Sequence, residues 1–120
     1  MLYSYAMSDE ARIYHIAHNA DVVRLMNGEN YRCASLESEG FIHCCSQRQL
    51  PGVTARYYAD VDDVHLLIID VDKLTPALVL ENTVGGDELF PHVYGPIAPD
   101  CILDCVPYGL QSTERMGLND

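Results

Sequence analysis

The alternation of apolar and polar residues predicts a chain built mainly of short strands. The clearest strand covers 64–69, where nearly every residue is apolar, as is typical of a strand buried on both faces at the centre of a sheet. In 12–17 successive side chains face opposite sides, so that His15 shares one face with Ile13. Shorter runs of the same kind predict further strands at 41–45, 78–80, 92–94 and 100–106.

Two short helices are predicted between the first strands. After Asn19, which we expect as the N-cap, apolar residues recur at helical spacing until Gly28 stops a helix at about 20–27. A second helix is expected at about 49–58, because Pro51 is compatible with a helix only in its first turn. Both helices therefore lie in the first half of the chain, one on each side of the second strand.

The order of these elements predicts the fold class. A strand, a helix, a strand and a helix precede four strands, which favours an α+β domain over a doubly wound parallel sheet. The 120 residues are the size of one domain. We assign this domain to 12–108, an N-terminal extension to 1–11 and a C-terminal tail to 109–120, and we expect no regular element in the polar segment 30–40.

The charge of the chain limits its partners. A total of 18 acidic residues against 7 Lys and Arg gives a formal net charge of −11, which repels the phosphate backbone of nucleic acids. No apolar stretch is as long as a membrane span, and the N-terminus lacks the pattern of a signal peptide. We therefore expect a cytoplasmic protein that binds neither nucleic acid nor membrane.

Three histidines, His15, His43 and His92, each lie in a strand-like segment next to a turn. A buried imidazole needs partners for its ring nitrogens, so each is either a structural histidine bonded to backbone carbonyls or part of a site. Spacings typical of metal ligands are absent, and no metal is expected. His43 and Cys45 would lie about 6.5–7 Å apart along a strand, which is too far for proton transfer, so we interpret Cys45 as a buried thiol.

Two further segments carry candidate chemistry. In 88–96, Glu88 and His92 stand among two prolines and a glycine, which favour a rigid platform at a loop-to-strand junction. A proline-rich turn with an exposed acid and histidine is an equally good interpretation of the same residues. Arg56, near the end of the second helix, either presents its charge to a ligand beside two tyrosines or is simply exposed at a helix end.

Segments spread over most of the chain, from about Arg12 to Pro107, resemble a known family in the same order. The specific ones are Phe41-Ile42-His43-Cys44 and Pro91-His92-x-Tyr94-Gly95-Pro96. They resemble the bacterial domain-of-unknown-function family numbered 952, whose fold is similar to that of ADP-ribosyltransferases. The resemblance therefore implies an ADP-ribosyltransferase-like split β-core with two short flanking helices, which holds NAD in a cleft.

The resemblance also implies roles for individual residues. His15 resembles the first-strand histidine that contacts the NAD ribose, and His43 falls near the tyrosine that stacks on nicotinamide. Either Glu88 or His92 takes the third position, normally a glutamate that stabilises the charge developing on the ribose. We therefore predict the catalytic residues His15, Glu88 and His92 and the substrate-binding residues His43, Ser46, Arg56 and Tyr94.

Two classes of function stay open at this point. The first is an enzyme that binds NAD or a related nucleotide as its substrate and transfers or cleaves at the ribose. The second is a binding or accessory module that kept the fold without catalysis. In both cases the expected ligand is small and nucleotide-like, and no particular protein partner is predicted.

Overall fold

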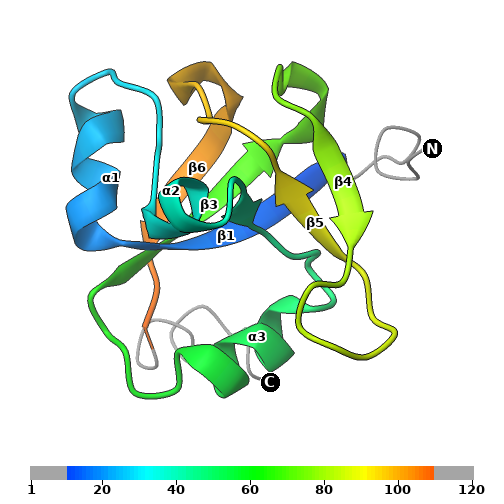
Figure 1. Cartoon of the computed structure of the whole chain (residues 1–120). Coiled ribbons are helices and arrows are strands. Elements are labelled where there is room, and N and C mark those ends of the chain that lie inside the picture. Colours follow the sequence, from blue (N-terminus) through cyan, green and yellow to red (C-terminus); the bar gives the residue numbers. More distant parts are fainter. Residues whose placement is uncertain (1–10, 110–120) are drawn as a thin grey trace.

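The structure is a computed structural model that describes residues 11–109. Within this range it contains three α-helices, six strands and two short 3-10 helices (Figure 1). In chain order they are β1 (Arg12–His18), α1 (Asn19–Met26), α2 (Ala34–Ser38), β2 (Ile42–His43), α3 (Leu50–Tyr57), β3 (Val64–Asp70), η2 (Val71–Lys73), β4 (Leu78–Glu81), β5 (Phe90–Val93), η3 (Pro99–Cys101) and β6 (Ile102–Pro107).

The described strands form two antiparallel sheets, of order β1-β3-β6 and β2-β5-β4. β3 pairs with β1 along its whole length and with β6 on its other edge, which confirms the central strand predicted at 64–69. In Figure 1 β1 and β3 run across the middle of the domain, β4 and β5 stand at one side, and α3 lies below them. The described residues therefore form one compact α+β domain, as predicted.

The β1-β3-β6 sheet is covered on both faces. On one face Leu67 of β3 belongs to a core shared with Val93 of the second sheet. On the other face Leu66 belongs to a second core shared with Leu50 of α3. Buried residues on both faces explain the nearly continuous apolar sequence of β3, in which only His65, Ile68 and Asp70 are half-buried.

The chain after β2 crosses from one sheet to the other. β2 pairs with β5 over two residues only. Cys45 then exchanges two backbone hydrogen bonds, each of 2.8 Å, with Tyr14 of β1. The single strand predicted at 41–45 is therefore wrong in extent, because this segment changes its partner strand partway along.

Helices α1 and α3 lie where the sequence predicts them. Asn19 is the first residue of α1 and His18 is its N-cap, so the predicted N-cap is wrong by one residue. The side-chain oxygen of Asn19 accepts a hydrogen bond from Nδ1 of His65 at 2.6 Å instead of capping the helix. Gly28 follows the end of α1 with a φ of 79°, which fits its predicted role as a stop. Pro51 lies in the first turn of α3, where its missing N–H leaves no helical hydrogen bond unmade.

Helix α2 lies inside the segment 30–40, where no regular element is predicted, so that prediction is wrong. The helix has five residues, which is too short to show an apolar period. Its stability comes from tertiary contacts: Leu36 packs against the core, and Ser35 donates its hydroxyl to the carbonyl of Phe41 at 2.7 Å.

The predicted extension 1–11 and tail 109–120 lie outside the described residues, apart from Ala11 and Gly109. Within the described part β1 begins at Arg12 and β6 ends at Pro107. None of the helices between residues 11 and 109 is long and apolar enough to cross a membrane.

Candidate functional site

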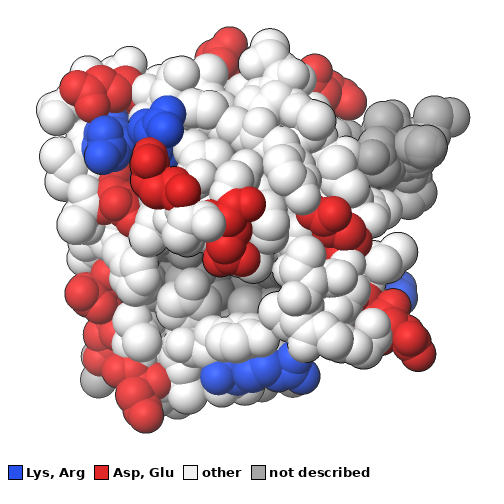
Figure 2. All heavy atoms as spheres, in the orientation of Figure 1, with Lys and Arg blue, Asp and Glu red and all other residues white. Residues whose placement is uncertain are grey.

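A cavity of about 510 Å³ opens between α3 and the strands above it. In Figure 2 this face is hollowed over α3, with acidic side chains above the hollow and basic charge below it. The lining comes from β1, the segment around β2, α3 and its following turn, the β4–β5 connection and β5. Its aromatic, histidine and carboxylate side chains are Tyr14, His15, His18, Glu39, His43, Tyr57, Tyr58, Phe90 and His92.

The register of β2 against β5 brings two of the predicted histidines together. His43 lies directly opposite His92, so both side chains point to the same face of the sheet. Their ring centroids are 5.1 Å apart, with the rings edge to face at 79°. The ring of Phe41 stacks on His92, with centroids 4.1 Å apart. These three side chains form one aromatic cluster, of which His43 and His92 line the cavity.

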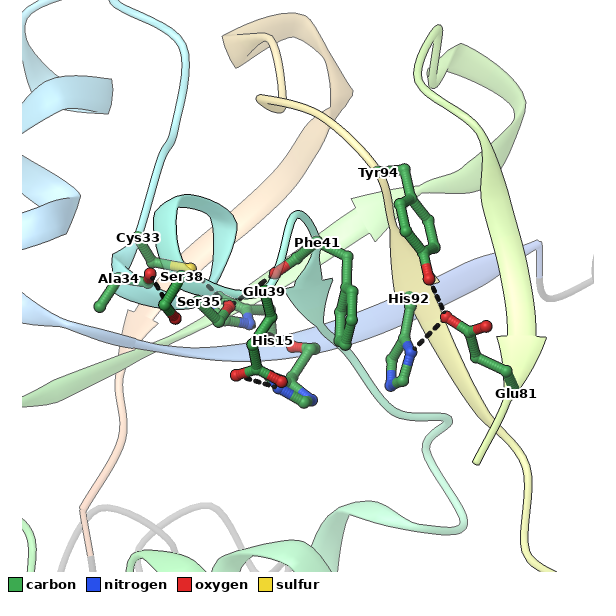
Figure 3. A network of polar contacts seen from close by, with 11 residues as sticks. His15, Cys33, Ala34, Ser35, Ser38, Glu39, Phe41, Glu81, His92 and Tyr94 are labelled. Carbon is green, nitrogen blue, oxygen red and sulfur yellow. Dashed lines mark hydrogen bonds and ion pairs between the residues drawn. The ribbon is translucent and has the colours of Figure 1, made fainter. Parts of the chain in front are cut away.

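His92 is 2 % exposed, and the protein engages one of its ring nitrogens. Its Nδ1 lies 2.8 Å from Oε2 of Glu81 on β4, and Figure 3 shows the imidazole turned toward that carboxylate. An ionised carboxylate only accepts hydrogen bonds, so Nδ1 carries a proton, and in the neutral imidazole the lone pair is then on Nε2. Nε2 has no hydrogen-bond partner among residues 11–109, and the ring lines the cavity.

Glu81 also accepts a hydrogen bond from a second donor. Tyr94, two residues after His92 on the same side of the sheet, donates its hydroxyl to the same carboxylate oxygen (Figure 3). The hydrogen bonds from Tyr94 and His92 lower the pKa of Glu81, and the bond to Glu81 raises the pKa of Tyr94. At neutral pH the carboxyl group is therefore ionised and the phenol is protonated.

Both ring nitrogens of His15 are hydrogen-bonded within the protein. Nδ1 donates to the backbone carbonyl of His43 at 2.5 Å, and Nε2 lies 2.7 Å from the hydroxyl of Tyr31. Since a carbonyl only accepts, Nδ1 carries the proton and Tyr31 donates to Nε2. Burial lowers the pKa of His15 to about 4, so the ring is neutral at neutral pH. His15 thus fixes the backbone that carries His43.

Glu39 is the carboxylate of the cavity lining. Its Oε2 lies 3.3 Å from Nε2 of His43, and about half of each side chain is exposed to solvent. Water screens such a pair, so its contribution to stability is small. The pair matters instead because it places one negative charge beside the histidine cluster at the opening of the cavity.

Glu88 and Ser46 lie outside the cavity lining as far as the described residues form it. Glu88 is exposed on the β4–β5 connection, where it accepts a hydrogen bond from the side-chain amide of Gln49 at 3.1 Å. The Ser46 hydroxyl accepts from the backbone N–H of Gln49, and Oε1 of Gln49 accepts from the Ser46 N–H. This reciprocal pair has the bonding pattern of a capping box but closes the turn that precedes α3, which gives Ser46 a structural role.

Arg56 and Tyr94 stand near the cavity without lining it within the described part of the chain. The guanidinium carbon of Arg56 lies 5.9 Å from the centre of the Tyr57 ring, which does line the cavity. Tyr94 is directed at Glu81. Of the seven predicted site residues, the structure therefore brings His15, His43 and His92 into one lining and leaves the other four around it.

Sequence reasoning misses Glu81 as the partner of His92. In the β4–β5 register Val79 lies opposite His92, and Glu81 is two residues further on the same face, which makes it a diagonal neighbour. Glu88 is closer to His92 along the chain, but it turns toward α3. The strand predicted at 78–80 stops one residue before Glu81, so only the true extent and register of β4 reveal this pair.

The cysteines next to His43 are not prepared as nucleophiles, which agrees with the interpretation of Cys45 as a buried thiol. Burial raises the pKa of Cys44, and it raises the pKa of Cys45 to about 12. The thiolate is the reactive form, so both thiols stay unreactive at neutral pH. No disulfide forms among the five cysteines of the chain. Between residues 11 and 109 no group of three or more His, Cys, Asp or Glu side chains could hold a metal ion.

Comparison with known proteins identifies the family. The profile of the family described as "Protein of unknown function (DUF952)" matches residues 16–105. The crystal structure of protein CC0527 from Caulobacter crescentus superposes with a TM-score of 0.70 at 24% identity, covering 80% of this chain and 84% of that one. For the solution NMR structure of CC0527 the TM-score is 0.71 at 24% identity, with 89% and 97% covered. This likeness shows a shared fold, and no curated protein matches the chain. Because the profile covers most of its length, the chain belongs to the DUF952 family.

Proposed function

We propose that the cavity binds NAD or a related nucleotide and that the domain acts on the bond between nicotinamide and ribose. The observation that carries the proposal is that His43 and His92, from paired strands, line one cavity of about 510 Å³. That volume lies within the range of small-molecule sites. The proposal interprets the two three-stranded sheets as a split β-core of the ADP-ribosyltransferase type, as the family resemblance implies.

The charge of the lining favours one end of the dinucleotide. Among residues 11–109 the lining contains the carboxylate of Glu39 and no lysine or arginine. The nicotinamide ring of oxidised NAD is positively charged, so this end suits the cavity, whereas an unpaired diphosphate does not. Arg56 lies beside Tyr57, which lines the cavity, and this arginine would meet the diphosphate outside the cavity.

The proposed reaction breaks the bond between the nicotinamide nitrogen and C1′ of the ribose. The electron pair of that bond leaves with nicotinamide, and positive charge develops on the ribose. Glu39 lines the cavity and would stabilise this charge in place of Glu88. A water or acceptor hydroxyl then bonds to C1′, and its proton passes to Nε2 of His92.

Binding is tested by titrating the protein with NAD, ADP-ribose and nicotinamide while following the imidazole resonances. We expect NAD to shift the signals of His43 and His92. The signal of His65, which is bonded to Asn19 at the surface, should stay in place and serves as an internal control. If none of the three compounds moves His43 or His92, the proposal fails.

A substitution at Arg56 tests where the diphosphate lies. We expect Arg56→Ala to weaken binding of NAD and ADP-ribose about 10-fold, the scale of one phosphate–guanidinium contact, and to leave nicotinamide binding unchanged. Arg24→Ala on α1 is the matched control, because Arg24 is exposed and lies on a helix that does not line the cavity. Calorimetry with the three compounds measures the effect. Equal weakening of nicotinamide and NAD would contradict this arrangement.

A non-catalytic binding module is the second candidate, and one observation favours it. Both ring nitrogens of His15 are bonded within the protein, and Glu88 is bonded to Gln49 outside the lining, so neither is free for the role that the resemblance implies. Incubation with NAD followed by analysis for free nicotinamide separates the two. Release that is lost in His92→Gln favours the enzyme, and binding without release favours the module.

A further inference from the structure

We propose that Glu81 is a positioning residue that holds His92 in the tautomer whose Nε2 lone pair faces the cavity, with Tyr94 as the donor that keeps Glu81 in place. The use of that lone pair on a ligand rests on the proposed function. The positioning itself is a property of the protein alone and can be measured without any ligand.

Three contacts from two segments restrain the His92 ring. The carboxylate of Glu81 on β4 accepts a hydrogen bond from the Nδ1–H of His92 at 2.8 Å. Phe41, before β2, stacks on the ring with an angle of 13° between the planes, which restricts rotation about χ2. His43 on β2 meets the ring edge to face at 5.1 Å. With 2 % of the residue exposed, the imidazole has little room for another orientation.

A carboxylate specifies the tautomer in a way that a neutral side chain does not. An ionised carboxylate has no proton to donate, so only the Nδ1–H form of His92 makes the bond to Glu81. A glutamine amide would accept from Nδ1–H or donate to a bare Nδ1, and both tautomers would then be populated. The hydrogen bonds from Tyr94 and His92 lower the pKa of Glu81, which keeps its carboxylate ionised over a wider pH range.

The consequence for the cavity is a fixed hydrogen-bond acceptor in a mostly apolar and aromatic wall. Nε2 of His92 accepts from a hydroxyl or N–H of a ligand and repels a carbonyl oxygen at the same point. Histidines held by a carboxylate in this way serve as general bases in enzymes, because the negative charge stabilises the imidazolium that forms when a proton arrives. Other titratable groups near the ring are His43, which faces it from β2, and Glu39, bonded to His43.

The test is the tautomer of His92, read from the ¹⁵N shifts of its ring nitrogens at neutral pH without ligand. We expect the wild-type protein to show a protonated Nδ1 and an unprotonated Nε2. In Glu81→Gln we expect averaged shifts from a mixture of tautomers. Glu29→Gln is the control, because this exposed glutamate lies in the turn after α1, away from His92, and it should keep the wild-type pattern. A wild-type ring protonated at Nε2, or an unchanged pattern in Glu81→Gln, overturns the inference.

Tyr94→Phe provides a second and milder test, because it removes a donor to Glu81 without touching His92. At neutral pH we expect the wild-type tautomer to persist. On acidification the carboxylate of Glu81 should take up its proton at a higher pH than in the wild type, and the ¹⁵N pattern should change at that same pH. An identical onset in both proteins contradicts the role of Tyr94.

The outcomes separate this inference from the proposed function. If the tautomer depends on Glu81 but NAD does not bind, the positioning role stands and the proposed ligand is wrong. If NAD binds and the tautomer of His92 does not change in Glu81→Gln, NAD is supported as the ligand and the positioning role of Glu81 is wrong. If nicotinamide is released, we expect Glu81→Gln to lower kcat about 10- to 100-fold with little change in KM, as for other residues that orient a reacting group.

Discussion

The three predicted site histidines, which line the cavity together with His18, differ in how their ring nitrogens are bonded. His15 has both nitrogens bonded inside the protein, whereas His92 has Nδ1 bonded to Glu81 and Nε2 facing the cavity. The sequence leaves both interpretations open for each histidine, because an imidazole in a strand looks the same whether its partners are a carbonyl and a phenol or a carboxylate and a ligand. The structure therefore favours a structural role for His15, whereas Nε2 of His92 has no hydrogen-bond partner among residues 11–109.

The buried state of His15 predicts a loss of stability in acid. Its pKa is about 4 in the folded chain and about 6.5 when exposed, so between these values only the unfolded chain binds the proton. The free energy of unfolding therefore falls as pH drops from about 6.5 to about 4, by about 3 kcal/mol in total for this residue. We expect His15→Gln to be less stable than wild type at neutral pH and to lose most of this pH dependence.

Urea denaturation at a series of pH values measures this difference. His65→Gln is the matched control, because the His65 imidazole is bonded to Asn19 at the surface, and this variant should keep the wild-type slope. If His15→Gln and wild type lost stability equally over the same pH range, the buried neutral imidazole would not be the cause.

Short elements set the geometry between the two sheets. Gly40, at a φ of 90°, turns the chain between α2 and β2, so that Glu39 and Phe41 on either side of it reach the His43 and His92 cluster. A φ of this sign is costly for any residue with a Cβ. The sequence shows the glycine but not the helix before it, because α2 depends on contacts with the core rather than on an apolar period.

Two glycine substitutions should have opposite effects. We expect Gly40→Ala to lower the free energy of unfolding by about 1–2 kcal/mol through backbone strain alone, since no atom lies within 4 Å of the added methyl group. Gly52→Ala in α3 also meets no atom within 4 Å and has no positive φ, so it should raise stability by about 0.5–1 kcal/mol. Denaturation of both variants tests this contrast, and destabilisation of equal size in the two would refute it.

The domain as a whole is organised around β3, whose two faces belong to two different cores. Leu67 faces the core between the sheets and Leu66 the core next to α3. A continuous apolar run is enough to predict this central place, because only a strand covered on both sides can lack polar positions. The formal net charge of −11 is likewise a property of composition and is the same whatever the fold.

The central position of β3 predicts that truncating a buried leucine lowers the free energy of unfolding far more than truncating an exposed one. We expect Leu67→Ala, at a side chain with no exposed surface, to lower the free energy of unfolding by about 2–5 kcal/mol through lost burial and the cavity left behind. Leu103→Ala on β6, where 47% of the residue is exposed, should change it by less than about 1 kcal/mol. Equilibrium denaturation by urea compares the two, and similar losses would show that β3 is not the core strand.

The sequence by itself determined the features that depend on residues close together in the chain or on the composition as a whole. Such features depend on the periodicity and backbone preferences of neighbouring residues, which are visible in the sequence. They are the apolar run of β3, the alternation in β1, the stop at Gly28 and Pro51 in the first turn of α3. The tertiary structure alone decided three other features. These are the place of Glu81 rather than Glu88 beside His92, the crossing of the chain after β2, and the existence of α2. Each of these depends on strand register or on contacts between distant segments, and a shift of one residue in register would turn Glu81 and His92 to opposite faces.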